Sequence, residues 1–179
     1  QSGLVIEHAS SPFLQLKDTT QNASFKVYAQ NSDVHVTTGS SHPMIFDINN
    51  SEKMRINTSG QVLVNSSTAV TTGTTGKLQI NGTDNSGSTF TIGRFSANTN
   101  SPALNFVKSR NGTVGSNTIV QDGDNLGEIT FYASDGSDTA SSAAKIMAEV
   151  DGTPGSNDMP GRIGFFTTAD GGSSPTEKM

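Results

Sequence analysis

Apolar residues occupy every second position in a series of short runs along the chain, such as Phe25/Val27/Ala29 and Met44/Phe46/Ile48. This alternation has the period of a β-strand with one buried face. Between the runs lie residues that tolerate tight turns, including Asn31-Ser32-Asp33 and Asp151-Gly152. The pattern therefore predicts an all-β protein. The expected strands contain Leu14/Leu16, Phe25/Val27/Ala29, Val34/Val36, Met44/Phe46/Ile48, Val62/Val64, Leu78/Ile80, Phe90/Ile92, Leu104/Phe106, Ile129/Phe131, Ile146/Ala148/Val150 and Ile163/Phe165.

One segment carries two conflicting signals. The alanines between Asp138 and Val150 have high helix propensity and would support a short helix. In the second half of the segment, Ile146, Ala148 and Val150 occupy alternate positions directly before a turn signal. We expect a strand in that half, with a short helix as the alternative.

Two short signatures occur twice and divide the chain. The run Ser11-Pro12-Phe13-Leu14-Gln15-Leu16 is echoed by Ser101-Pro102-Ala103-Leu104-Asn105-Phe106, and Ser51-Glu52-Lys53-Met54 by Thr176-Glu177-Lys178-Met179. Internal repeats indicate a modular or stacked architecture. The stretch between the two units is rich in Ser, Thr, Gly and Asn and has few apolar residues. We predict a first β module at residues 1–56, a Ser/Thr/Gly-rich connecting stalk at 57–100, and a second, longer β module at 101–179.

The composition provides little material for a core within one chain. Only 31% of the 179 residues are hydrophobic, against about 45–50% in ordinary globular domains. Only 15% are charged and the net charge is −5, so the chain lacks the strong charge of a disordered segment. A chain of this kind becomes rigid when copies share one core. We expect short-stranded fibrous β modules that form a homotrimer; the alternative is compact β-sandwich modules joined by a thin stalk.

Several functional classes are excluded. The absence of cysteine removes disulfide scaffolds, thiolate metal sites and cysteine nucleophiles. No apolar run approaches the roughly 18 residues that a membrane-spanning helix needs, so we expect no membrane insertion. With a pI near 5.0 and scattered Lys and Arg, the chain has no basic stripe for nucleic acid. The missing initial Met and the abrupt end at Met179 suggest a segment of a longer polypeptide.

Two groups of side chains have the chemistry of metal ligands. His8, His35 and His42 are close in sequence, but His35 should point outward from its strand and His42 precedes a proline in a loop. The run 122–125 with Glu128 has oxygen ligands at short spacing. Its spacing does not match the twelve-residue calcium loop, and Asp-Gly is equally typical of a tight turn. We expect no metal site and no cofactor.

Catalytic pairs are also not evident. Glycoside hydrolysis needs two carboxylates about 5–9.5 Å apart, and the chain has 16 acidic residues. Most of them stand beside Gly, Asn or Ser, where turn roles are the simpler interpretation. We therefore expect no catalytic residues and no enzymatic activity. The acids considered are Asp47, Asp135, Asp138, Glu149, Asp151, Asp158 and Asp170.

Three runs carry a family resemblance. Residues 52–64, from Glu52-Lys53-Met54-Arg55-Ile56 to Val62-Leu63-Val64, resemble a linker found repeatedly in tail-fibre and related structural proteins of tailed bacteriophages. Residues 110–120 and 148–179 are similar to the same family, and the long C-terminal run is the more specific. One departure is that Leu63-Val64-Asn65 stands where the family has Gly-Ile-Gly.

The resemblance implies a function as well as an assembly. In that family the pattern belongs to fibrous virion appendages, commonly homotrimers, and often precedes an intramolecular chaperone that cleaves itself off. This chain has no match to the chaperone, so its Ser–Lys cleavage chemistry is not carried over. The expectation is a structural segment of a tail fibre or other virion appendage, extracellular when mature. It would act as a rigid spacer for host attachment, with other virion tail or fibre proteins as partners.

Three alternatives remain. The chain might itself bind host surface polysaccharide, although Tyr28 and Tyr132 are its only tyrosines and Trp is absent. The other two alternatives are a part of a tailspike depolymerase and a bacterial surface adhesin of convergent composition.

The alternating apolar residues are the candidates for a core shared between copies, which we call the shared-core seam. Its members are Leu14, Leu16, Phe46, Ile48, Ile56, Val62, Val64, Leu104, Phe106, Ile129, Phe131, Ile163 and Phe165.

Overall fold

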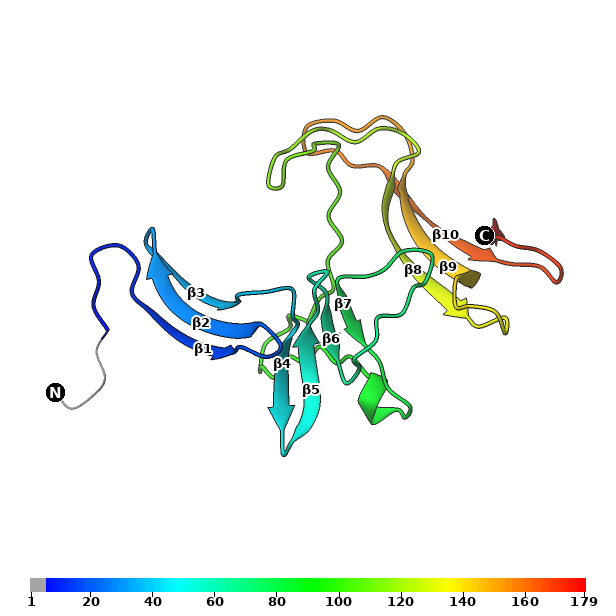
Figure 1. Ribbon diagram of the computed structural model, residues 1–179. Coiled ribbons are helices and arrows are strands. Elements are labelled where there is room, and N and C mark those ends of the chain that lie inside the picture. The colour runs from blue at the N-terminus through cyan, green and yellow to red at the C-terminus, as the bar shows by residue number, and fades with distance from the viewer. Residues whose placement is uncertain (1–5) are drawn as a thin grey trace. The chain divides into compact units, whose positions relative to one another are not determined.

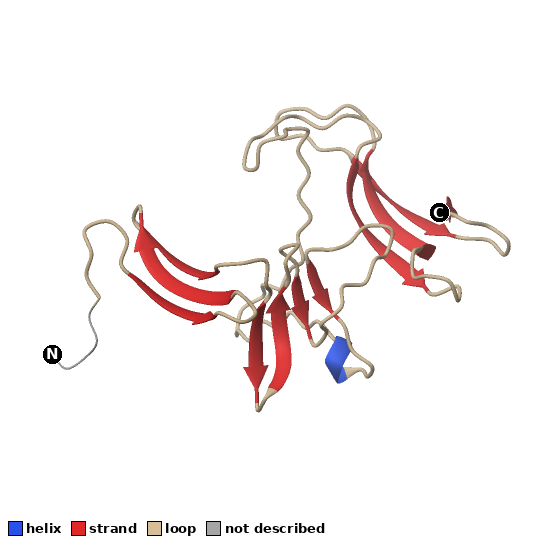
Figure 2. Ribbon diagram, in the orientation of Figure 1, coloured by secondary structure: helices blue, strands red, loops and turns tan. Residues whose placement is uncertain are grey.

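The structure is a computed structural model that describes residues 6–179, so residues 1–5 of the predicted first module lie outside it. In the described residues the chain forms eleven strands in three sheets and no α-helix (Figures 1 and 2). The all-β prediction is confirmed. Backbone contacts divide the chain into two compact units, residues 6–70 with 75–90 and residues 71–74 with 91–179.

The first sheet of the first unit is an antiparallel meander of β1 (Phe13–Asp18), β2 (Ala23–Gln30) and β3 (Asp33–Thr38). The β2–β3 connection is a two-residue turn in which Asn31 and Ser32 have φ of 52° and 69°. Positive φ at both positions is the geometry that fits the twist of a hairpin. The predicted turn at Asn31-Ser32-Asp33 is therefore confirmed.

The second sheet of this unit has the order β4 (Met44–Ile48), β5 (Ser51–Ile56), β6 (Val62–Val64) and β7 (Leu78–Ile80). The first three strands are antiparallel neighbours, and β7 runs parallel to β6 after a crossover at residues 65–77. Strands β6 and β7 thus extend the sheet that begins with β4 and β5.

The described residues contain one short helical element. The turn Ser86–Ser88 is a single 3-10 turn, in which the Asp84 carboxylate accepts a hydrogen bond of 2.8 Å from the Gly87 amide. No helix within residues 6–179 is long and apolar enough to cross a bilayer.

The second unit has one sheet, an antiparallel meander of β8 (Asn125–Ala133), β9 (Ser141–Val150), β10 (Gly161–Thr167) and β11 (Thr176–Glu177). The Ala-rich segment is therefore strand and not helix, because its residues pair with β8 on one side and β10 on the other. Since the described residues of this unit form a single sheet, they do not form the sandwich of the alternative prediction.

Two predicted strands are absent. Residues around Phe90/Ile92 and Leu104/Phe106 belong to a long irregular stretch between β7 and β8. The prediction was wrong because alternation shows which side chains can share a face and does not supply a hydrogen-bonding neighbour. Phe106 still packs against the sheet, since a Cβ atom on Gly127 would lie 2.7 Å from its Cβ.

Very little of the chain is buried. Among the described residues the buried hydrophobic side chains are Leu63, Val120, Met147 and Val150, and Gln61 is the buried polar one. The solvent-accessible surface is 13478 Å². Two separate compact domains of half the mass each would expose about 9,900 Å² in total. The chain therefore exposes about 3,500 Å² more than compact units of its size.

Candidate interaction surfaces: three open apolar sheet faces

The first open face lies on the sheet β1–β2–β3. Its register places Leu14 opposite Val27 and Val36, and Leu16 opposite Phe25 and Thr38. Because side chains alternate across a strand, these residues share one face. Leu16 is 63% exposed and Leu14 46% exposed. Among residues 6–179 of the single chain, nothing covers this face to the extent that a core requires.

The second open face lies on the sheet β4–β7. Adjacent strands align Met44 with Ile56, Val62 and Leu78, and the next row on the same face contains Phe46, Met54, Val64 and Ile80. Ile48 is 62% exposed and Leu78 60% exposed. The alternate residues of this sheet point to its other face.

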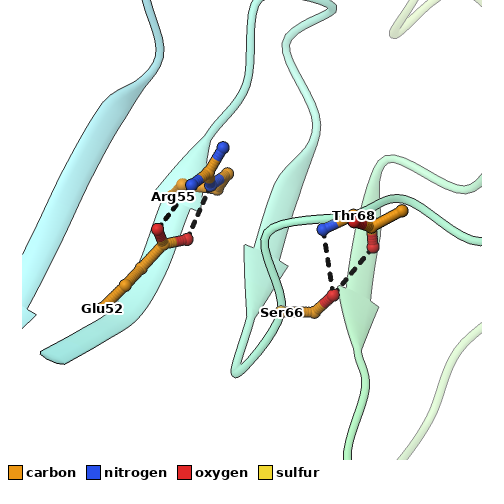
Figure 3. A network of polar contacts seen from close by, with 4 residues as sticks. All are labelled: Glu52, Arg55, Ser66 and Thr68. Atoms are coloured by element: carbon orange, nitrogen blue, oxygen red, sulfur yellow. Dashed lines mark hydrogen bonds and ion pairs between the residues drawn. The ribbon is translucent and has the colours of Figure 1, made fainter.

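That other face is covered by the chain itself. Leu63 is fully buried there, and the Gln79 amide accepts from the Val70 amide (2.8 Å) and donates to the Val70 carbonyl (2.9 Å), which ties the crossover segment to β7. Ser66 and Thr68 fix the turn that begins this segment, as Figure 3 shows.

An ion pair lies on β5. Arg55 Nε donates to Glu52 Oε1 (2.6 Å) and Arg55 Nη2 to Glu52 Oε2 (2.5 Å), in a bidentate pair (Figure 3). The hydrogen bond from Arg55 lowers the pKa of Glu52. Arg55 aligns with Leu63 and Gln79 across the strands, and therefore belongs to the closed face. The sheet thus has one face satisfied within the chain and one open apolar face.

A groove joins the two open faces of the first unit. It has a volume of about 790 Å³ and is lined by residues of both sheets, including Leu16, Phe25, Val36, Met44 and Phe46. The lining is mostly aliphatic and aromatic, which fits an apolar side chain and not a polar small molecule.

The third open face lies on the sheet of the second unit. Ile129, Ile146 and Phe165 align across β8, β9 and β10. Ile163, 64% exposed, lies on the same face. A smaller groove of about 410 Å³ here includes Leu104 and Phe106 of the irregular stretch, which extend the apolar surface beyond β8.

The opposite face of this sheet is charged. Lys145 pairs with Glu128 (3.3 Å), and Arg162 pairs with Glu149 (3.0 Å) and Glu177 (3.7 Å). The nearby carboxylates raise the pKa of Arg162. Such partly exposed pairs contribute little to stability, but they define this face as the one that faces water.

The predicted seam residues map onto these surfaces. Leu14 and Leu16 lie on the first face, five others on the second, and the rest on or beside the third. In the single chain eleven of the thirteen are exposed, and Val62 and Val64 are half-buried. Sequence reasoning left out further members of these faces, although the same alternation marks them. These members are Phe25, Val27, Val36, Met44, Met54, Leu78, Ile80 and Ile146.

The acidic run 122–125 forms a turn held by protein groups. Arg110 Nε and Nη2 each lie 2.7 Å from a carboxylate oxygen of Asp124, which also accepts from the Gln121 amide (2.9 Å). The Arg110 guanidinium is the main cause of a pKa of Asp124 far below its usual range. Asp122 accepts from the Gly152 amide (2.8 Å), and Gly123 has a φ of 79°. These contacts match the turn interpretation of the run.

The three histidines do not come together. His8 and His42 contact nearby serines in their own loops, and His35 stacks on Tyr28. Within residues 6–179 no three His, Asp or Glu side chains form a group that could hold a metal ion.

Two of the acidic residues that the sequence offers as possible catalytic groups, Asp135 and Asp138, also have local contacts. Asp135 accepts from the amides of Ser137 (2.8 Å) and Asp138 (3.2 Å), which lowers its pKa. Asp138 accepts from the Ala140 amide (2.8 Å). Both are therefore engaged in the β8–β9 turn.

A scan of the sequence against protein-family models finds no match, and a search of curated proteins finds none either. The likeness to phage tail fibres thus rests on the sequence runs quoted above. The most unusual surfaces of the described residues are the three open apolar faces.

Proposed function

We propose that this chain is a structural segment of a phage tail fibre or other virion appendage, in which three copies share a core built from the open apolar faces. The segment acts as a rigid spacer that supports host attachment, with other virion tail or fibre proteins as its neighbours. It needs no cofactor and carries out no reaction. The observation that carries the proposal is that each of the three sheets has a face of mainly apolar and largely exposed or half-buried side chains.

The exposed area supports association between copies. The surface in excess of two compact domains is about 3,500 Å², whereas a stable protein interface buries about 1,200–2,000 Å². Contiguous apolar patches larger than a few hundred Å² are rare on monomers and mark interaction sites. Burial of the faces would supply the core that the composition cannot supply within one chain.

A second copy of the same chain is the simplest cover. Each face is mainly apolar and has no charged residue in its central rows, so equivalent faces of identical copies are chemically complementary. The opposite faces of the β4–β7 and β8–β11 sheets carry ion pairs, and that of β4–β7 also carries the covering crossover segment. The opposite face of β1–β3 carries aromatic and polar residues. These faces would point outward. The preference for three copies comes from the resemblance to homotrimeric fibre proteins.

The first test is the solution mass by light scattering over about two decades of dilution. We expect three times the chain mass of 18.6 kDa, persisting on dilution. A stable monomer would contradict the shared core and direct attention to a discrete binding module.

A matched pair of variants then locates the interface. Ile163 and Arg162 are neighbours on β10 whose side chains point to opposite faces. Ile163→Lys should weaken the assembly, so that the mass falls at a concentration at which the wild type is still associated, because it places a charge in the shared core, whereas Arg162→Lys should leave the mass unchanged. Equal masses for both variants would place the interface elsewhere.

A further inference from the structure

The face of the β1–β3 sheet opposite the apolar one carries three aromatic rings in a row. Phe13, Tyr28 and His35 are directly aligned across the three strands. Tyr28 and His35 stack with ring centroids 4.5 Å apart and planes within 9°. Phe13 is 54% exposed. These are all three aromatic rings of that face, and they stand next to one another in a chain that is only 6% Phe, Trp and Tyr.

A shallow hollow of about 250 Å³ lies beside this row. It is lined by Ser11, Phe13, Lys26, Tyr28, Gln30 and Thr37. The lining combines ring surfaces with hydroxyl, amide and ammonium groups. That combination suits a ligand with one apolar face and a rim of hydroxyl groups, because rings cover the apolar face while polar groups bond the rim. A pyranose has this shape.

Charge narrows the class of saccharide. Lys26 neighbours Tyr28 on this face, and Lys17 lies one row further along the same face. Neither lysine has a carboxylate partner within ion-pair distance among the described residues. Asp33 is the acidic residue on the strands of this face, one row beyond Tyr28 and beside Gln30, so the face carries two lysines against one carboxylate, in a chain whose net charge is −5. A carboxylate on the sugar would complement the lysines.

We infer that the face around Phe13, Tyr28 and His35 binds an acidic polysaccharide, with a uronic or similar sugar acid seated in the hollow. Phe13 and Tyr28, the two rings that line the hollow, cover the sugar ring, and Lys26 pairs with the carboxylate. The inference rests on the proposed function, since burial of the opposite, apolar face between copies leaves this face in contact with water. Each copy would carry one such site, and several sites on one assembly would raise the avidity for a repeating polymer.

Calorimetric titration tests the site on the whole chain. The probes are oligosaccharides of alginate, hyaluronan and polysialic acid, with maltodextrin of the same length as the neutral comparison. We expect saturable binding of at least one acidic probe, weakened by salt. Tyr28→Thr and Lys26→Gln should each raise the dissociation constant about tenfold or more, equivalent to about 1.4 kcal/mol. Tyr132→Thr, on the sheet of the second unit, is the matched control and should bind like the wild type.

The outcomes separate the site from the assembly. Absence of binding by all three acidic probes overturns the inference, as does binding that the Tyr28 and Lys26 variants leave unchanged. Equal affinity for maltodextrin overturns the assignment to an acidic sugar. Light scattering on the same samples reports the assembly independently, so a trimer without binding contradicts only the site, and a monomer contradicts the proposed function.

Discussion

At the scale of single residues, the irregular stretch packs closely against β8 at Gly127. A Cβ atom there would lie 2.7 Å from both Cβ and Cγ of Phe106. We predict that Gly127→Ala lowers the free energy of unfolding by about 1–3 kcal/mol, as overpacking does, and releases the stretch around Phe106 from β8. Chemical denaturation and limited proteolysis near Val107 would measure the two effects.

The same substitution in a variant that lacks the Phe106 side chain tests whether the contact with Phe106 is the cause. In Phe106→Gly, which removes the clashing atoms, Gly127→Ala should cost no more than about 0.5 kcal/mol. Gly112→Ala is the control, since a Cβ atom there meets nothing within 4 Å. An equal cost of Gly127→Ala in both backgrounds would show that the contact with Phe106 is not the cause.

The pairing of Asp124 with Arg110 makes a pH-dependent contribution. Because the pKa of Asp124 is lowered in the folded state, its contribution to stability is present above the unfolded pKa of about 3.9. It is lost as pH falls from there towards the lower folded pKa. We predict that Asp124→Asn destabilises the protein at neutral pH and that the difference from wild type shrinks below about pH 4. Denaturation curves between pH 2 and pH 7 measure it, and a difference that is constant over this range would contradict the role of the charge.

At the scale of elements, two-residue turns with positive φ form two of the hairpins of the first unit. Asn49 and Asn50, with φ of 51° and 57°, join β4 to β5 as Asn31 and Ser32 join β2 to β3. Asparagine enters this left-handed region more easily than other residues with a side chain, and β-branched residues are strained there. We predict that Asn50→Val costs about 1–2 kcal/mol, whereas Asn50→Gly is close to neutral. Thermal unfolding of both variants provides the comparison, and a Val variant as stable as the Gly variant would contradict the turn geometry.

The sequence predicted elements well where alternation coincided with turn chemistry. The strands around Phe25, Phe46 and Ile146 were found because apolar runs ended at Asn or Asp-Gly turns. Leu104 and Phe106 alternate equally well, yet they form no strand. Their side chains reach the apolar surface beside β8 without backbone pairing, and alternation cannot report which backbone groups have a partner.

At the scale of the whole molecule, the sequence predicted many of the residues that lie on the open apolar faces, but not all of them. A low apolar fraction showed that one chain could not bury its own core, and the register then placed the alternating residues on three faces. The aromatic row was not foreseen, because Phe13, Tyr28 and His35 are distant in sequence and meet only through strand register. Pairing between strands is a long-range property, and short-range patterns do not determine it.

The open faces of the β1–β3 and β8–β11 sheets belong to different units. A charge placed on one of these faces should therefore affect only the unit that carries it. We predict that Leu16→Lys speeds hydrogen exchange of the amides in β1–β3 and leaves those of β8–β10 protected, while Ile163→Lys does the reverse. The physical reason is that an assembly made of two separate sets of apolar contacts loses only the set that receives the buried charge. Gln15→Glu, next to Leu16 but on the opposite face, where it stands across from Lys26, adds a charge outside the apolar face and should change neither set. Faster exchange of both units in either variant would show instead that the two units assemble as one cooperative structure, in which the core of each unit depends on the other.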